Sequence, residues 1–157
     1  MNKKVSSKTF SRYVAIQALY NSNYQNDYEQ IKKYFLDTNE FELQFDFKVN
    51  LHSYKLNKIF LKTLLLTFNE ERNKVDSLIE SNLENNWNLN RLPKVLLSIL
   101  RVAVTEMIIS KNTSIGIIAS EYIMFTESFY TEKEYLFTNA ILEKIYVNLH
   151  KKNTLNE

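Results

Sequence analysis

Glycine and proline are nearly absent from this chain, and that scarcity constrains its fold more than any other feature of the sequence. Only Gly116 and Pro93 occur among the 157 residues. Sandwiches and barrels need glycine and proline repeatedly, because their tight turns require special backbone angles. Helices joined by loops of Asn, Ser and Thr do not. The sequence therefore predicts an all-α protein, long enough to bury a core without disulfides or metals.

Apolar residues at helical spacing predict three helical stretches in the first half of the chain. They are a helix over about 10–21, a shorter one over 28–36, and one long helix or two over 53–83 with a break near Asn69. The acidic segment 37–50 is predicted to be a loop. The Asn-rich stretch around Trp87 marks the predicted boundary between an N-terminal helical subdomain, about 8–84, and a C-terminal one, about 91–150.

The second half predicts a central helix followed by two more. A helix over about 92–110 starts beside Pro93, where a proline is tolerated. It is apolar on most of its circumference except for a polar stripe, so it should form the centre of a bundle. The stripe is Lys94, Ser98, Arg101 and Thr105, and the residues predicted to be buried are Ile99, Leu100, Ala103 and Met107.

Capping signals delimit the last two helices. Ser114 can cap a helix that runs to about Phe129, and Thr131 with Glu134 has the spacing of a capping box that opens a helix over about 132–149. The inner face of this last helix is predicted to be Ala140, Ile141, Ile145 and Leu149, with a frayed tail from Lys151. In all, about seven helices are expected.

The residues that most enzymes and metal sites need are scarce. The chain has no cysteine, and its two histidines, His52 and His150, lie far apart without a partner at metal-ligand spacing. We therefore expect no catalytic site, no metal and no cofactor. The longest apolar stretch, 95–109, is interrupted by polar residues and is shorter than the roughly 20 residues of a membrane span. A cytoplasmic protein is expected.

Basic residues are interleaved with aromatic ones at two places. The first 20 residues contain Lys3, Lys4, Lys8 and Arg12 but no acid. Lysine and arginine neutralise phosphates, and aromatic rings stack on unpaired bases, which is how single-stranded RNA is held. The two groups are Lys8, Arg12, Tyr13, Gln17 and Tyr20 on the first helix, and Lys133, Tyr135 and Phe137 on the last. Solvated charges beside the core residues Tyr20 and Phe137 explain the same pattern equally well.

Three blocks resemble the transcription antitermination factor NusB family, in that family's order. The first is AIQALY at 15–20, similar to A-x-Q-A-L-Y. The second is WNLNRLPKVLLSILRVAVTEM at 87–107, where the family has W, a later R-L and I-L-R-x-A-x-x-E. The third, within 121–145, keeps the family's spacing at Glu121, Phe129, Phe137, Asn139, Leu142 and Lys144. The match at 21–84 extends only to length and helical character.

This resemblance implies an all-helical, non-catalytic fold of two subdomains that binds boxA-type RNA together with the ribosomal small-subunit protein NusE. The joint complex would load on RNA polymerase and promote processive transcription of ribosomal RNA operons. Monomeric and homodimeric states are both compatible with it. The RNA-binding residues are then predicted to be Lys4, Lys8, Arg12, Gln17, Tyr20, Lys133 and Phe137, and the structural ones Arg101, Glu106, Glu121 and Asn139. The starts of the first and last helices are expected to lie side by side and to form one RNA surface.

Several positions depart from the family pattern. The N-terminal end is commonly rich in arginine, but here Lys3, Lys4 and Lys8 leave only Arg12 with a planar fork for phosphate. Leu96 and Leu97 occupy positions that are often charged. A helical protein-interaction module without RNA binding is therefore the alternative. A NusB-like RNA methyltransferase is excluded, because that enzyme needs a glycine-rich cofactor loop and a catalytic cysteine.

Overall fold

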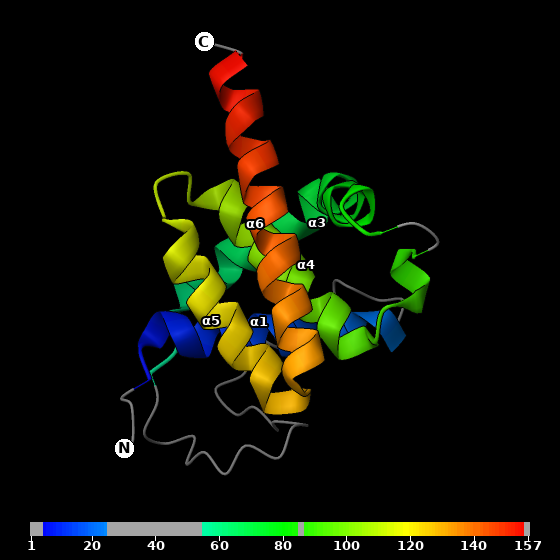
Figure 1. Ribbon diagram of the computed structural model, residues 1–157. Helices are drawn as coiled ribbons and strands as arrows, with labels where there is room; N and C mark the ends of the chain where they lie inside the picture. The colour runs from blue at the N-terminus through cyan, green and yellow to red at the C-terminus, as the bar shows by residue number, and fades with distance from the viewer. Residues whose placement is uncertain (1–4, 25–54, 85–86, 156–157) are drawn as a thin grey trace.

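The computed structural model describes residues 5–24, 55–84 and 87–155, and in this part of the chain the regular secondary structure is entirely helical (Figure 1). The all-α class is confirmed. The predicted helix at 28–36 and the acidic loop at 37–50 lie outside the described residues. The described elements are α1 (Ser7–Tyr24), α3 (Lys58–Ser81), a 3-10 turn (Leu89–Arg91), α4 (Lys94–Ile109), α5 (Ile115–Phe129) and α6 (Glu132–Leu155).

Side-chain caps fix where the first two described helices begin. Ser6 Oγ accepts a hydrogen bond from the Thr9 amide at 3.0 Å, so α1 begins one turn earlier than predicted. Asn57 Oδ1 accepts one from the Phe60 amide at 3.0 Å and opens α3. The predicted break in α3 is a kink: the helix continues, but Glu71 has non-helical angles of φ −104° and ψ 16°.

Helix α4 is the centre of the molecule, as predicted. Every residue from Leu96 to Met107 is buried, and this includes the four predicted core residues. Of the predicted polar stripe, Ser98, Arg101 and Thr105 are buried, whereas Lys94 is exposed. The hydroxyls of Ser98 and Thr105 donate to the carbonyls one turn earlier, Lys94 O and Arg101 O, at 2.8 and 2.7 Å. Leu96 and Leu97 are core residues here, which accounts for the loss of charge at these positions.

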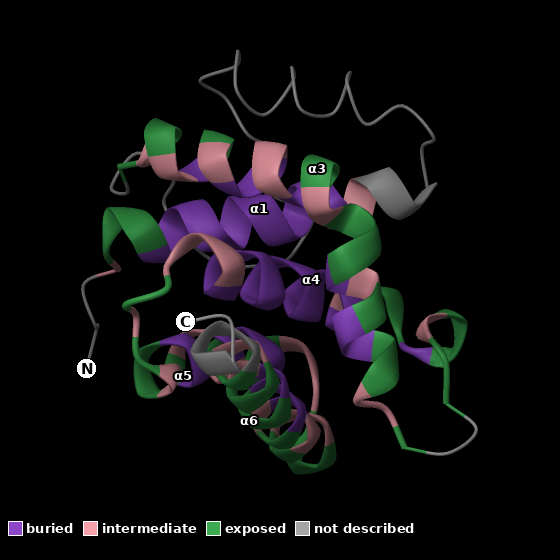
Figure 2. Ribbon diagram, turned by 90° about the horizontal axis from the view of Figure 1, so that it is seen from above, coloured by how far each residue is buried: buried purple, intermediate pink, exposed green. Residues whose placement is uncertain are grey.

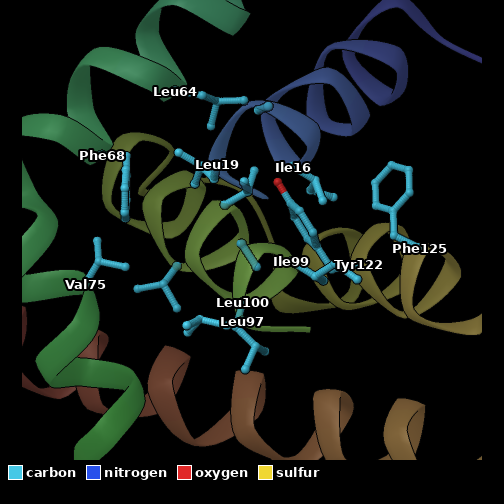
Figure 3. Packing of buried hydrophobic residues seen from close by; sticks show 14 of the residues in the cluster. Ile16, Leu19, Leu64, Phe68, Val75, Leu97, Ile99, Leu100, Tyr122 and Phe125 are labelled. Carbon is cyan, nitrogen blue, oxygen red and sulfur yellow. The ribbon is translucent and has the colours of Figure 1, made fainter. Parts of the chain in front are cut away.

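The helices form layers around α4. Figure 2 shows the buried α4 between α1 on one side and α6 on the other, with α3 beyond α1. Helices α5 and α6 pair with each other as neighbours across a short turn, and α4 packs against α1, α3, α5 and α6. Figure 3 shows side chains from four helices meeting in one core, including Leu19, Phe68, Leu100 and Tyr122. Buried residues of both predicted subdomains belong to this one cluster.

The α5–α6 hairpin begins with the predicted caps. Ser114 Oγ accepts from the Ile117 amide at 3.4 Å, and Glu134 Oε2 accepts from the Thr131 amide and hydroxyl at 3.1 and 2.8 Å. The predicted end of α6 is wrong, because the helix continues to Leu155. Its predicted inner face needs one correction: Ala140 is exposed, and Leu142 is buried in its place. None of the described helices is long and apolar enough to cross a membrane.

Candidate nucleic-acid interface

The first turn of α1 carries Lys8 at an exposed position beside the start of α3. Its Nζ atom lies 5.4 Å from the centre of the Phe60 ring, a cation–π distance. Two hydrogen bonds hold the helix starts together, because Ser11 Oγ accepts from the Asn57 amide at 2.9 Å and donates to the Asn57 carbonyl at 3.1 Å. The predicted Lys4 lies outside the described residues. Lys8 is thus presented from a firmly held helix start.

The start of α3 adds exposed lysines that the sequence analysis did not select. They are Lys55, Lys58 and Lys62. Neither residues 5–24 nor residues 55–69 contain an Asp or a Glu. Figure 1 shows both helices beginning at the same edge of the molecule. We call Lys8, Lys55, Lys58 and Lys62 the basic edge. Three lysines in an acid-free run of eight residues were the signal that could have revealed it.

Arg12 is not part of this exposed surface, although it was predicted to contact RNA. Its side chain is 8% exposed, and its Nε donates to both carboxylate oxygens of Glu106 on α4, with the Oε2 distance 3.1 Å. A second guanidinium nitrogen lies 3.3 Å from Glu121 Oε2 on α5. The guanidinium is therefore occupied inside the protein, and we assign it a structural role: it ties α1 to α4 and α5.

The surroundings of Arg12 form a buried polar network. Burial alone would lower the pKa of Arg12, but the hydrogen bond and charge of Glu106 outweigh it and raise that pKa. The Tyr122 hydroxyl donates to Glu106 Oε1 at 3.3 Å, and burial followed by the Glu106 charge raises the pKa of Tyr122. Thr9 donates to Glu121 Oε1 at 3.1 Å. Glu106 and Glu121 therefore both hold α1 in place.

The remaining predicted residues lie at different depths. Gln17 is 1% exposed, so it is a core residue and we remove it from the RNA surface, whereas Tyr20 is half-buried. Arg101 joins α4 to α3 by two parallel hydrogen bonds to Asp76, at 2.9 and 3.0 Å. Asn139 is half-buried on α6.

Lys133 and Phe137 lie together in a groove of about 360 Å³. We call it the α4–α6 groove. Lys133 is exposed and Phe137 half-buried, as is needed for contact with a ligand. The side chains that line it are Asn82, Leu83, Glu84, Trp87, Leu92, Pro93, Leu96, Lys133, Glu134, Phe137, Ala140, Ile141 and Lys144. Trp87 and Lys144 were not among the predicted site residues.

The structure does not place the starts of α1 and α6 side by side, as the sequence analysis expected for one RNA surface. Helix α4 lies between α1 and α6 (Figure 2), and no described residue of α1 lines the α4–α6 groove. The basic edge and the groove are therefore two separate features. Within the described residues, no three His, Asp or Glu side chains are grouped so that they could hold a metal ion.

Comparison with known proteins gives consistent matches over most of the chain. Residues 9–147 match the model of the NusB family. The "Transcription antitermination protein NusB" of Rickettsia typhi is 31% identical over 147 residues, which cover 90% of this chain and 92% of that protein. The solved structure "T. maritima NusB, P3121, Form 2" has a TM-score of 0.71 at 25% identity, covering 88% of this chain and 89% of that one.

A second solved structure shares the fold. It is described as "Crystal Structure of Antitermination Factors NusB and NusE in complex with dsRNA". Its matching chain has a TM-score of 0.70 at 21% identity, and the match covers 90% of this chain and 97% of that one.

Proposed function

The chain belongs to the NusB family of transcription antitermination factors, which are not enzymes, and from this premise we propose that it binds boxA-type RNA together with the ribosomal protein NusE. In this role it promotes processive transcription of ribosomal RNA operons as part of an antitermination complex on RNA polymerase. Such work takes place in the cytoplasm. The two helical subdomains, about 8–84 and 91–150, then serve as one RNA-binding unit.

The observation that carries the proposal is the basic edge. Lys8 and Lys58 lie in the first turns of α1 and α3, and neither helix has an acid in its first turn. Lysine at a helix start is unfavourable, because the helix dipole makes that end positive. A phosphate backbone reverses this penalty, since it supplies the negative charge that both the lysines and the helix ends favour.

The NusE part of the proposal is supported by the fold-sharing structure in which NusB and NusE are together with double-stranded RNA. The RNA contacts that we propose for this chain are Lys4 and the basic edge to phosphates, Lys133 to a phosphate at the separate α4–α6 groove, and Tyr20 and Phe137 to bases. Arg12 and Gln17 are left out, because both side chains are buried.

Fluorescence anisotropy with a labelled boxA-like RNA tests the proposal. We expect the chain to bind this RNA more tightly than a scrambled RNA of the same length, and to bind it more tightly still when purified NusE is present. The scrambled RNA is the matched control, because phosphate contacts do not depend on sequence. Binding of NusE without any binding of RNA would instead identify the chain as a helical protein-interaction module.

A further inference from the structure

A buried serine joins the starts of α1 and α3. Ser11 on α1 is fully buried, and its hydroxyl donates to the Ser7 carbonyl of its own helix at 2.8 Å. A serine inside a helix often makes this local bond. The same oxygen also accepts from the Asn57 amide at 2.9 Å and can donate to the Asn57 carbonyl at 3.1 Å. One side chain of α1 therefore holds the backbone of a residue 46 positions later.

Asn57 is the residue that caps α3. Its side chain accepts from the Phe60 amide at 3.0 Å, and its carbonyl accepts from the Leu61 amide at 3.0 Å. These two bonds satisfy amides at the first turn of the helix and so fix where it begins. Because Ser11 binds the backbone of this cap, it ties the start of α3 to α1.

The residues beside this bridge carry two charges of the basic edge. Lys8 lies three residues before Ser11, on the same face of α1, and Lys55 lies two residues before Asn57. The Phe60 ring of α3 contacts Lys8 at the cation–π distance given above, 5.4 Å. The spacing between Lys8 and Lys55 therefore depends on how the start of α3 is held against α1.

Arg12 anchors the same turn of α1 to the rest of the core. Its guanidinium is bound by Glu106 on α4 and Glu121 on α5, and its Cζ atom also lies 5.4 Å from the centre of the Phe60 ring. The turn that carries Ser11 is thus fixed to two other helices. It forms a firm base from which the Ser11 hydroxyl can hold the cap of α3.

We propose that Ser11 is a positioning residue for RNA binding: its bond to Asn57 sets the spacing of Lys8 and Lys55, so that the two lysines hold phosphates of one strand cooperatively. Two contacts to one ligand reinforce each other when their spacing is fixed beforehand, because less freedom is lost on binding. The inference rests on the proposed function and extends it to a side chain that is itself too buried to touch RNA.

A double-mutant cycle in RNA affinity measures this cooperativity. Lys8→Ala and Lys55→Ala together should lower the affinity less than the product of their separate effects, by a factor of at least about 2. Ser11→Ala should abolish this difference and should itself lower the affinity by about the same factor. The salt dependence should stay unchanged, because Ser11→Ala removes no charge. A merely structural role would change neither the affinity nor the cooperativity of the folded protein.

Ser98→Ala is the matched control. Ser98 is also fully buried, and its hydroxyl likewise donates to the carbonyl four residues earlier at 2.8 Å, but it lies on α4. Circular dichroism establishes that both variants are folded, and Ser98→Ala should bind RNA with the affinity of the parent chain. The positioning role would be overturned if folded Ser11→Ala bound RNA as tightly as Ser98→Ala and kept the cooperativity of Lys8 and Lys55.

Hydrogen exchange of the unsubstituted chain tests the bridge itself. The Asn57 amide should exchange well below the rate of an unstructured amide, because its proton is donated to Ser11. Exchange at the unstructured rate would overturn the bridge. Additive effects of Lys8→Ala and Lys55→Ala in the parent chain would overturn the positioning role alone, whereas absence of any RNA binding would overturn the proposed function as well.

Discussion

Replacing Arg12 by alanine would leave the Glu106 carboxylate buried without its counter-ion. The Glu106 side chain is 1% exposed, and the other hydrogen bond shown to reach it, from Tyr122, is 3.3 Å long. Removing one partner of a buried ion pair typically costs about 3 to 5 kcal/mol, because a charge is left in a low-dielectric interior. For a chain of this size that corresponds to a fall in Tm of roughly 6 to 20 °C.

Urea unfolding followed by circular dichroism would measure the loss of stability. RNA titration at several salt concentrations would show whether Arg12 contacts phosphate. Folded Arg12→Ala should keep the salt dependence of RNA binding, because the guanidinium does not reach phosphate. Lys8→Ala, at an exposed position one turn earlier, should do the opposite: stability unchanged and the salt slope lower by about 0.7. Two results together would refute this reasoning: an Arg12→Ala variant whose free energy of unfolding stays within about 1 kcal/mol of the parent, and a fall in the salt dependence of its RNA binding.

Three further predictions concern stability. Leu100→Ala should lower the free energy of unfolding by about 2 to 5 kcal/mol, because Leu100 is fully buried; a loss under about 1 kcal/mol in urea unfolding would mean that α4 is misplaced. Arg101→Ala should lower Tm but not RNA affinity, since the hydrogen bonds of Arg101 go to Asp76. An unchanged Tm with weaker RNA binding would instead show that Arg101 contacts RNA. The hydrogen bond from the Thr131 hydroxyl lowers the pKa of Glu134 below its ordinary value. A carboxyl whose pKa is lower in the folded than in the unfolded protein stabilises the fold when the pH is above the unfolded-state pKa. This stabilisation is lost as the pH falls through the folded-state pKa. Thr131→Val should therefore lower Tm at pH 7 but much less in acid, and an equal loss at both pH values would contradict the assignment.

Local signals predicted the helices well. The Ser114 cap and the Thr131–Glu134 capping box lie within four residues of the amides that they satisfy, so spacing alone reveals them. The apolar circumference of 92–110 likewise predicted a central helix. Burial of Ser98 and Thr105 was not predicted, because it depends on their hydroxyls being satisfied by carbonyls of their own helix. Sequence spacing does not show whether such a serine or threonine is buried in the core or exposed to solvent.

The candidate site was less predictable, because it depends on contacts between distant parts of the chain. Arg12 has the appearance of an exposed cation until the fold brings Glu106, 94 positions later, against it. Trp87 and Lys144 meet Phe137 only because α6 folds back along the start of α4. The same packing places α4 between α1 and α6, which separates two basic regions that the sequence analysis joined.

The central claim is that the basic edge holds the phosphates of RNA, and the salt dependence of binding tests it most directly. The variant Lys8→Ala/Lys55→Ala removes two charges from the edge, and Lys74→Ala/Lys111→Ala removes two exposed charges elsewhere with the same change in net charge. The slope of log affinity against log salt should fall by roughly 1.4 in the first variant, at about 0.7 for each contact with a single strand, and stay unchanged in the second. Equal falls in both variants, or none in the first, would contradict the claim.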